Sequence, residues 1–365
     1  MPSAEFWMKR ALELARRGFY TAHPNPRVGC VIVKNNHVIA EGFHLQAGAL
    51  HAEAMALSNL KESAEGADVF VTLEPCAHFG RTPPCAEALV RAKVKKVFIA
   101  TLDPNPLVAG RGVQILKNEG IDVAVGILES DARALNVGFL KRFEIGRAFI
   151  RIKTAASLDG KTALLNGKSK WLTSDAARLD AMRYRASASA ILTGIGTVLA
   201  DNPQMNVRQN FGKTQKIRQP IVFVMDSFYR TPLESPILKN EKVVIIGNAP
   251  DSDALLKRQN LLKNHAEILE VANTQNLKSV VEKITADFAL NEIHVEAGKT
   301  LNGAFLKAGL VDELVLYVAP VVLGEKARSL FALAELTDLS QKLCFQIAAI
   351  KPLPPDFCVV ATFCG

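Results

Sequence analysis

Short apolar runs of strand length alternate with segments of helical periodicity along nearly the whole chain, and this alternation limits the fold to a few classes. In the first part of the sequence, apolar residues have helical spacing at 4–18, 51–60, 85–92 and 112–118. Strand patterns lie at 68–73, 96–100 and 122–125, and 28–40 predicts a hairpin that turns at Asn35-Asn36. Helices that alternate with strands favour an α/β layer over a helical bundle.

The alternation continues through the C-terminal part after a break near residue 146. The segment 136–146 is predicted to connect two regions, and a new strand follows at 149–154. Buried strands are then expected at 190–193, 221–225, 243–246, 268–271, 293–295 and 314–318, and helices at 175–185, 253–262, 277–288 and 301–307. Because 365 residues exceed the usual size of one domain, we expect two domains, 1–146 and 147–365.

The composition is typical of a globular protein with a sizeable core. Hydrophobic residues make up 49% of the chain and charged residues 22%, so a core can form without disulfide bonds. No apolar run approaches the roughly 18 residues of a membrane span. The N-terminal residues lack the apolar core of a signal peptide, which predicts a cytoplasmic location. The net charge of +8 comes from scattered Lys and Arg residues, which favours an anionic small substrate or cofactor over nucleic acid.

One group of His, Glu and Cys residues has the spacing of a catalytic zinc site. His51 and Glu53 are followed by Cys76, which a Glu-Pro pair precedes, and then by Cys85. One imidazole and two thiolates suit zinc and leave the fourth position of its tetrahedron open for water, whose pKa the metal lowers. Glu53, two residues from His51, is placed to carry a proton between this water and the leaving group. The other cysteines are predicted to be small buried hydrophobes: Cys30, Cys344, Cys358 and Cys364.

This group matches part of the pattern H-x-E followed by P-C-x-x-C that is found in zinc-dependent nucleobase deaminases. The second cysteine is displaced, because the run CAHFGRTPPC begins at Cys76 and ends at Cys85. His78 within that run is an alternative ligand. Taken singly, a His-x-Glu pair on a helix usually belongs to a polar surface, and a lone cysteine usually lies in the core. Their joint order, with prolines before both cysteines, favours a metal site.

The C-terminal half contains no complete nucleotide-binding signature. Three Gly-Lys-Thr triplets begin at positions 160, 212 and 298, but none has the glycine that a P-loop requires five residues earlier. Gly194 and Gly196 begin a dinucleotide fingerprint that fails at Leu199, so neither a P-loop NTPase nor a Rossmann dehydrogenase is supported. The stretch 295–304 lies between a strand and a helix, where it could bind phosphate through backbone N–H groups or form a simple turn. Glu296 lies at the carboxyl end of the strand, where ligands of open α/β sheets bind.

Longer runs of sequence around the zinc group resemble one known family. TLEPCAHFGRTPPC, with HPNPRVGCVIV upstream and DPNPLVAGRG downstream, is similar to the deaminase half of the bifunctional riboflavin-biosynthesis deaminase–reductases, in which the displaced second cysteine is the rule. The resemblance implies zinc ligands at His51, Cys76 and Cys85, a proton shuttle at Glu53, and substrate contacts at Asn25, His44 and Arg81. Arg81 would suit the phosphate of the substrate, since a guanidinium binds phosphate in a fork, or would simply point to solvent.

Four further runs resemble the reductase half of the same family: RIKTAASLDGKTA, SKWLTS, ILTGIGTVLADNPQMNVR and VEAGKTLNGAFLKAGLVDEL. That half is similar in fold to dihydrofolate reductase and uses NADPH. The implied cofactor contacts are Ala155, Trp171, Thr197, Asp201, Ser227, Gly298, Lys299, Thr300, Leu301, Asn302, Gly303 and Ala304. The implied substrate contacts are Ser169, Arg185, Met205, Arg208 and Glu296, and the implied catalytic residues are Lys153 and Glu296. Arg185 and Arg208 fit a phosphate clamp, although an Arg more often forms a surface ion pair.

The sequence therefore predicts an α/β protein with a cytidine-deaminase-like N-terminal domain followed by a dihydrofolate-reductase-like C-terminal domain. The resemblance implies hydrolytic deamination of a diamino-hydroxy-phosphoribosylamino-pyrimidine, with one Zn2+ per chain, and then NADPH-dependent reduction of the ribosyl group to ribityl. It also implies a homo-oligomer formed through the reductase half, with no nucleic-acid or membrane partner. Two alternatives remain. One is a zinc deaminase of RNA or a nucleobase with an attached binding domain; the other is a binding module with structural zinc, although structural zinc normally has four protein ligands.

Overall fold

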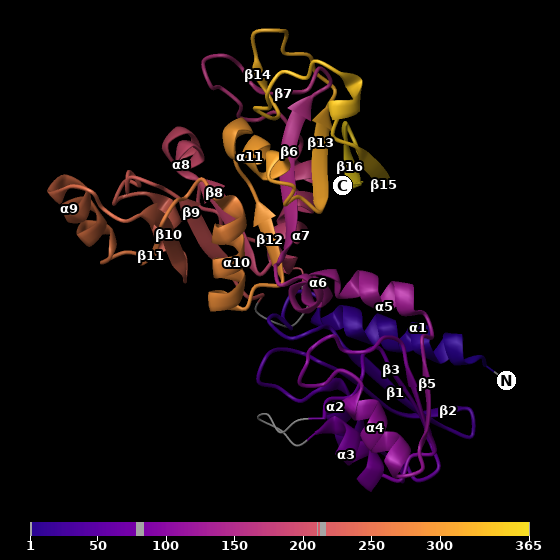
Figure 1. Cartoon of the computed structure of the whole chain (residues 1–365). Helices are drawn as coiled ribbons and strands as arrows, with labels where there is room; N and C mark the ends of the chain where they lie inside the picture. Colours follow the sequence, from indigo (N-terminus) through magenta and orange to yellow (C-terminus); the bar gives the residue numbers. More distant parts are fainter. Residues whose placement is uncertain (1, 78–83, 210, 212–216, 365) are drawn as a thin grey trace. The chain divides into compact units, whose positions relative to one another are not determined.

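The computed structural model of the chain describes residues 2–77, 84–209, 211 and 217–364. The chain forms two compact units, Met1–Gly146 and Arg147–Gly365 (Figure 1). Each unit has its own β-sheet and its own hydrophobic cores. No helix among the described residues has both the length and the apolar composition needed to cross a bilayer.

The N-terminal unit is built on a five-stranded sheet in the order β2-β1-β3-β4-β5. Its strands are β1 (Gly29–Lys34), β2 (His37–Phe43), β3 (Asp68–Val71), β4 (Lys96–Ile99) and β5 (Asp122–Val125). β1 pairs antiparallel with both β2 and β3, whereas β3, β4 and β5 are parallel. The turn between β1 and β2 has positive φ at Asn35 (50°) and Asn36 (63°), as a two-residue type I′ turn requires. The predicted hairpin is confirmed.

Helices cover both faces of this sheet (Figure 1). They are α1 (Ala4–Ala15), η1 (Arg16–Gly18), α2 (Ala52–Ser58), α3 (Cys85–Arg91), α4 (Arg111–Asn118), α5 (Glu129–Leu135) and α6 (Val137–Ile145). Because side chains alternate along a strand, Val31 and Val33 share one core with the buried face of α1, whereas Cys30 and Ile32 share a second core with α2 and α3. The segment 136–146 contains helix α6 rather than the predicted connection, because its apolar side chains are buried in the second core.

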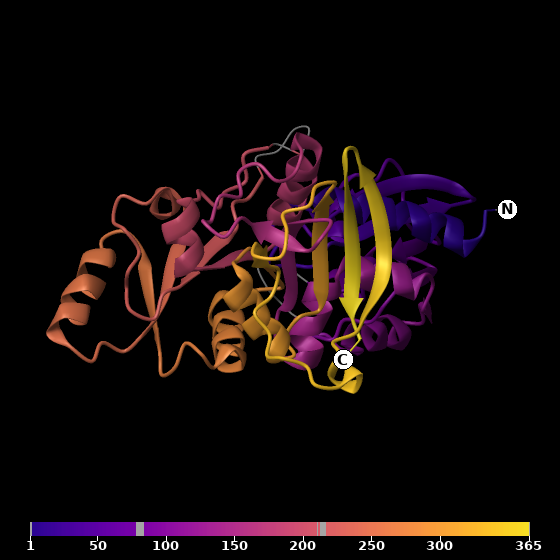
Figure 2. The ribbon, with the colours of Figure 1, turned by 90° about the horizontal axis from the view of Figure 1, so that it is seen from above.

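The C-terminal unit contains a nine-stranded sheet in the order β11-β10-β9-β8-β12-β6-β13-β16-β15 (Figure 2). Its strands are β6 (Phe149–Ser157), β8 (Ala190–Gly194), β9 (Ile221–Met225), β10 (Val243–Asn248), β11 (Glu267–Val271), β12 (Glu292–Val295), β13 (Glu313–Ala319), β15 (Phe345–Leu353) and β16 (Asp356–Phe363). The strands from β11 to β13 are parallel, and β13, β16 and β15 are antiparallel. A separate small sheet pairs β7 (Lys161–Ala163) with β14 (Arg328–Ser329).

The helices of this unit lie on both faces of the large sheet (Figure 2). They are α7 (Asp175–Ser187), α8 (Ile195–Asp201), α9 (Asp253–Leu262), α10 (Leu277–Phe288) and α11 (Lys299–Lys307), with short turns η2 (Pro236–Lys239) and η3 (Leu339–Gln341). α10 and α11 bury apolar side chains against one face, whereas α7 packs against β13 and β16 on the other. The chain starts with β6, builds β8 to β11 outward, and returns to place β12 between β8 and β6. The carboxyl ends of these three parallel strands therefore meet at one edge, where such sheets bind ligands.

The structure departs from the sequence-based expectations at the margins of the sheets. Helices α5 and α8, the β7–β14 pair and the β15–β16 hairpin were not predicted. The strand predicted at 268–271 forms as β11, but it is an edge strand without a fully buried residue, so the prediction of burial was wrong. Cys30 and Cys358 are buried as predicted. Cys344 and Cys364 are exposed instead, because they flank the hairpin at the opposite edge.

Candidate active sites

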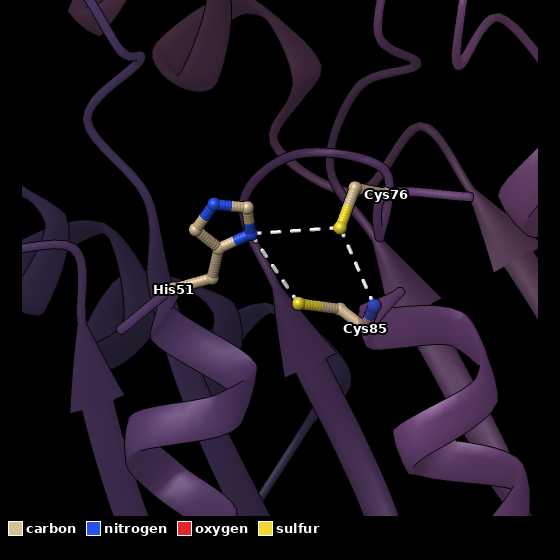
Figure 3. A group of neighbouring side chains, drawn as sticks. All are labelled: His51, Cys76 and Cys85. Atoms are coloured by element: carbon tan, nitrogen blue, oxygen red, sulfur yellow. Dashed lines mark hydrogen bonds between the residues drawn. The ribbon is translucent and has the colours of Figure 1, made fainter. Parts of the chain in front are cut away.

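The three predicted zinc ligands converge in the N-terminal unit (Figure 3). His51 Nδ1 lies 3.5 Å from Sγ of Cys76 and 3.5 Å from Sγ of Cys85, and all three atoms lie within 4.8 Å of one another. A zinc ion about 2.1 Å from nitrogen and about 2.3 Å from sulfur, in tetrahedral geometry, separates N from S by about 3.5 Å. Arg81 and the alternative ligand His78 lie outside the described residues. The three donor atoms are therefore spaced as ligands of one zinc ion.

Each of these side chains is held at the end of a different element. His51 immediately precedes α2, Cys76 follows β3, and Cys85 begins α3. The backbone N–H of Cys85 donates to Sγ of Cys76 (3.3 Å). Hydrogen bonds from the Cys85 thiol, His51 and this N–H lower the pKa of Cys76 to about 4, and the shared hydrogen bond raises the pKa of Cys85. A cluster that favours a thiolate suits a divalent cation, so the residues present fit zinc.

Glu53 lies beside this cluster, in the first turn of α2, with its side chain buried. Burial and the negative charge of Cys76 raise the pKa of Glu53 to about 7. The neighbouring His51 and Cys85 side chains act in the opposite direction and lower this pKa. Glu53 is therefore not part of a solvated helix face, and its carboxyl group is close enough to the three ligand side chains to interact with them.

Glu74 contributes to the site in a way that the sequence did not reveal. Its buried carboxylate accepts backbone N–H groups of Asp103 (3.3 Å), Gly110 (3.0 Å) and Val113 (3.2 Å). Gly112 in the first turn of α4 lies so close that an added Cβ would be 2.0 Å from the carbonyl oxygen of Pro75. The N-terminus of α4 is thus packed against the Glu-Pro pair that precedes Cys76. The second glycine of DPNPLVAGRG, Gly112, marks this close packing, but nothing in the sequence linked it to Glu74.

Two predicted substrate contacts of this unit, Asn25 and His44, lie against each other. Asn25 Nδ2 is 3.0 Å from Nε2 of His44, and Nδ1 of His44 is 3.1 Å from the carbonyl oxygen of Leu50. Because a carbonyl oxygen only accepts, His44 carries its proton on Nδ1 and accepts the Asn25 amide on Nε2. Burial lowers the pKa of His44, which favours this neutral form. The His44 and His51 rings meet edge-on with centroids 5.6 Å apart, so His44 lies between Asn25 and the predicted zinc ligand His51.

In the C-terminal unit, four of the predicted residues converge where β12 ends beside the middle of β6. Glu296 follows β12, and Arg185 from α7 donates through Nη2 to Oε2 (2.9 Å) and through Nε to Oε1. Lys153 Nζ lies 3.9 Å from the same Oε2, and Arg185 also contacts Sδ of Met205 (3.8 Å). Burial alone would raise the pKa of Glu296. The positive charges of Arg185 and Lys153 outweigh this effect and hold that pKa well below its usual value. The group is a buried ionic centre, not a surface ion pair.

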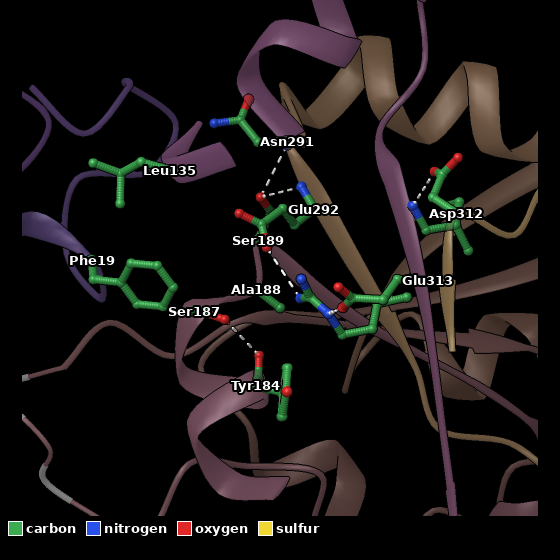
Figure 4. Close-up of polar contacts among 12 residues, drawn as sticks. Phe19, Leu135, Tyr184, Ser187, Ala188, Ser189, Asn291, Glu292, Asp312 and Glu313 are labelled. Atoms are coloured by element: carbon green, nitrogen blue, oxygen red, sulfur yellow. Dashed lines mark hydrogen bonds and ion pairs between the residues drawn. The ribbon is translucent and has the colours of Figure 1, made fainter. Parts of the chain in front are cut away.

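A second ionic group lies at the amino end of β12, where Glu292 is on the same face of the strand as Glu296. Figure 4 shows Glu292, Glu313 and Ser189 of this group. Arg151 on β6 pairs with Glu292 on β12 (3.1 Å) and with Glu313 on β13. The hydroxyl of Ser189 accepts the backbone N–H groups of Asn291 and Glu292, both at 3.0 Å. These contacts anchor β12 between its neighbours at the end remote from Glu296.

The stretch predicted to bind NADPH includes the first turn of α11, whose N-cap is Gly298. No side chain of the described residues caps this helix, and Gly298, Lys299 and Thr300 are exposed. A Cβ added at Gly298 would meet no described atom within 4 Å. Asn302 Nδ2 donates to the carbonyl oxygen of Ala297 (2.9 Å), and its buried Oδ1 has no partner among the described residues. Uncapped N–H groups that face open space suit the phosphates of a dinucleotide.

The other predicted ligand residues of this unit lie on the segments around these two groups. Ala155 is on β6, Ser169 and Trp171 lie between β7 and α7, Thr197 and Asp201 are on α8, and Leu301, Gly303 and Ala304 are on α11. Trp171 is 74% exposed, and the Arg178 guanidinium lies 4.5 Å from its ring centroid. The Ser227 hydroxyl is 2.6 Å from that of Thr274, and exposed Arg208 donates to Gln204 (3.3 Å). Their contacts with a ligand stay predictions.

Comparison with known proteins matches both units to described families. Residues 1–101 match the cytidine and deoxycytidylate deaminase zinc-binding region, and residues 148–359 match the RibD C-terminal domain. Over 97% of its length the chain is 44% identical to the riboflavin biosynthesis protein RibD of Escherichia coli, of which it covers 98%. The chain belongs to the RibD family. Among solved structures, RibD of Acinetobacter baumannii is similar at a TM-score of 0.92, with 46% identity and 99% of both chains covered.

A second RibD-like structure extends the comparison to a more distant relative. The deaminase/reductase of Thermotoga maritima is similar at a TM-score of 0.87, with 31% identity and 99% of both chains covered. The predicted fold, a cytidine-deaminase-like domain followed by a dihydrofolate-reductase-like domain, is confirmed. This RibD-family chain is a bifunctional deaminase and reductase of riboflavin biosynthesis, and its two domain types imply Zn2+ and NADPH as cofactors. The alternative of an RNA or nucleobase deaminase with a binding domain is not favoured.

Proposed function

We propose that residues 1–146 carry the deaminase activity and residues 147–365 the reductase activity. The family matches support this division, since the zinc-binding region ends at residue 101 and the RibD C-terminal domain begins at residue 148. The observation that carries the proposal is the convergence of His51, Cys76 and Cys85 beside the buried Glu53. The proposed substrate is a diamino-hydroxy-pyrimidine with a phosphoribosylamino group, in keeping with the activity named for the Thermotoga maritima relative.

In the deaminase, His51, Cys76 and Cys85 would hold Zn2+, which when bound supplies Lewis-acid activation of water. Glu53 would take a proton from the attacking water and deliver it to the amino group that leaves as ammonia. Its buried position in the first turn of α2, two residues after His51, keeps the carboxyl group near the ligand cluster.

Asn25, His44 and Arg81 are the proposed substrate contacts. Because the Asn25 amide donates to Nε2 of His44, its NH2 group is oriented, and Oδ1 is left to accept an N–H of the pyrimidine. Arg81 is proposed to bind the substrate phosphate in a bidentate manner.

In the reductase, NADPH would bind with its phosphates at the first turn of α11 and would supply the hydride. Burial lowers the pKa of Lys153, which makes its ammonium group a better proton donor, and Glu296 holds that group at the carboxyl end of the sheet. The remaining predicted residues, Ser169, Met205 and Arg208, are proposed to contact the ribosyl phosphate substrate.

The test follows ammonia release and NADPH oxidation together in the purified full chain supplied with the diamino-pyrimidine substrate. We expect ammonia first and NADPH oxidation second. Glu53→Gln is expected to lower ammonia release by about 10²- to 10⁴-fold, the usual contribution of general acid–base catalysis. Substrate deaminated beforehand should restore NADPH oxidation in this variant. The exposed Glu62 provides a control, since Glu62→Gln should change neither rate. Unchanged ammonia release in Glu53→Gln would refute the assignment.

We also infer a homo-oligomer formed through the C-terminal unit. The edge strand β15 supports this inference, because its Ile347 is 59% exposed and its Ile350 is 62% exposed. An exposed apolar edge strand favours pairing with a second chain. The cytoplasmic location and the lack of a nucleic-acid partner stay predictions.

A further inference from the structure

Tyr317 lies in the middle of the C-terminal sheet and was not among the predicted site residues. It is on β13, and its side chain is 1% exposed. The parallel register pairs Tyr317 with Ala155 of β6, and Lys153 is two residues earlier on that strand. Because side chains alternate along a strand, Tyr317 and Lys153 lie on the same face of the sheet.

The ammonium group of Lys153 lies over the Tyr317 ring. Its Nζ is 5.7 Å from the ring centroid, within the range of about 6 Å in which the face of an aromatic ring attracts a cation. The same Nζ is 3.9 Å from Oε2 of Glu296, which is too far for a hydrogen bond. The position of the ammonium group therefore depends on attraction from both the carboxylate and the ring, and not on a direct hydrogen bond between Lys153 and Glu296.

The hydroxyl group of Tyr317 fixes the ring in this place. It donates to Oδ2 of Asp180 on α7 (2.8 Å), and Lys351 Nζ lies 4.0 Å from the same oxygen. Burial and the charge of Asp180 raise the pKa of Tyr317, so the phenol stays protonated and neutral. A phenol that donates to a carboxylate has a more electron-rich ring, because hydrogen-bonded groups polarise one another. The contact with Asp180 therefore orients the ring and increases its attraction for a cation.

The other groups near this ammonium act in opposite directions. Burial and the Arg185 guanidinium lower the pKa of Lys153, whereas Glu296 raises it. Burial raises the pKa of Cys358, the neighbour of Tyr317 on β16, to about 11, so its thiol is uncharged at neutral pH. The ring thus favours the charged form of Lys153 without placing a second anion beside Glu296.

We propose that Tyr317 is a positioning residue of the reductase: the face of its ring holds the Lys153 ammonium group beside Glu296. This inference rests on the proposed function of Lys153 and Glu296. Because the contact stabilises the ammonium form over the neutral amine, a ring with weaker attraction should let Lys153 lose its proton at lower pH. A side chain that only fills space would not have this effect.

The experiment places phenylalanine or trifluorinated phenylalanine at position 317 of the full chain. It measures kcat for NADPH oxidation against pH, with substrate that has been deaminated beforehand. The two rings have nearly the same shape, but fluorine withdraws electrons and weakens the attraction for a cation. Tyr317→Phe should shift the alkaline limb of the profile only slightly. The trifluorinated ring should shift it to lower pH by about 0.5 to 1 pH unit, a loss of about 3- to 10-fold in kcat on that limb.

Trifluorinated phenylalanine in place of Phe223 is the matched control. Phe223 is buried on β9 in the core that Ile152 shares, on the other face of the sheet from Lys153, so the alkaline limb should not move. The urea midpoint of each variant reports folding and should be equal for the two rings at position 317. Alkaline limbs that coincide for these two rings, or an equal shift in the control, would overturn the positioning role.

Lys153→Met tests the underlying proposal separately. If this variant oxidises NADPH at the wild-type rate, the reductase centre itself is wrongly placed. If it abolishes oxidation while the limbs of the two rings at position 317 coincide, only the inference about Tyr317 fails.

Discussion

His51, Cys76 and Cys85 are far apart in the sequence, and their donor atoms nevertheless meet. His51 precedes Cys76 by 25 residues and Cys85 by 34, yet its Nδ1 lies 3.5 Å from each sulfur. The residue types were informative because few roles other than metal binding need an imidazole, two thiols and a carboxylate in this order. The contribution of Glu74 was not predicted, because its partners are backbone N–H groups that only tertiary packing brings near.

Removal of zinc is expected to separate the two activities. Dialysis against a strong chelator should stop ammonia release, whereas oxidation of NADPH with substrate deaminated beforehand should continue. The reason is that His51, Cys76 and Cys85 lie in the N-terminal unit, whereas the proposed reductase residues belong to the C-terminal unit. Metal analysis before and after dialysis, with added Zn2+ as the restoring control, checks this result. Simultaneous loss of both activities would contradict it.

Glu296 is a residue whose charge matters for stability as well as for chemistry. Glu296→Gln is expected to destabilise the C-terminal unit by about 3–5 kcal/mol, because buried Arg185 loses its carboxylate partner. The pKa of Glu296 is held well below its usual value. A lowered pKa stabilises the folded state above the unfolded value, about 4.3, and this contribution is lost only as pH falls through the folded pKa.

The loss of stability caused by Glu296→Gln should therefore be the same at pH 5 and pH 8. Urea unfolding of the wild type and the variant at several pH values measures it. If the loss of stability disappears between pH 8 and pH 5, the carboxyl group of Glu296 titrates in that range. Its pKa would then be raised by folding, not lowered as expected.

Among the helices and strands, the periodicity of apolar residues predicted those elements whose apolar side chains all lie on one buried face. The hairpin of β1 and β2 and the helices α7, α9, α10 and α11 formed close to the expected positions. β15 was not predicted, because residues are exposed along most of its length and no apolar face alternates with a polar one. Helix α6 was not predicted because its short apolar pattern resembles a connection until the core of the unit is formed.

The start of helix α4 contacts Glu74, which precedes the predicted zinc ligand Cys76 by two residues, and the importance of this contact for the zinc site can be tested. Glu74→Gln replaces a carboxylate that accepts N–H groups of Gly110 and Val113 at the start of α4. We expect a loss of about 1–3 kcal/mol in the stability of the N-terminal unit, because the amide satisfies these donors poorly. We also expect faster release of zinc to a chromophoric chelator, since the backbone before Cys76 is less well held.

Glu87→Gln is the matched control for this substitution. Glu87 lies in the exposed part of α3 and pairs with Arg91 at 3.4 Å, so its loss should change stability by no more than about 0.5 kcal/mol. Equal effects of the two substitutions on zinc release would show that Glu74 has no special role.

In the whole molecule, β15 at one edge of the C-terminal sheet is the strand that we propose a second chain covers. Ile350→Glu introduces a charge on β15 and is expected to shift the protein toward the monomer. Light scattering after gel filtration measures the mass. Leu256→Glu on α9 of the same unit, where the side chain is 46% exposed, is the control and should leave the mass unchanged. A wild-type protein that is monomeric at all concentrations would refute the proposed oligomer.

Local patterns in the sequence were enough to predict the α/β class, the β1–β2 hairpin and the types of residue at the zinc cluster. These features depend on local periodicity, on the backbone angles that Asn35 and Asn36 adopt, and on which side chains a metal accepts. The insertion of β12 between β8 and β6, which brings Glu296 to Arg185 across 111 residues of chain, became visible only in the folded molecule. The same is true of the contact between Glu74 and the start of α4. Contacts between distant segments depend on the order of strands, and no local pattern in a sequence encodes that order.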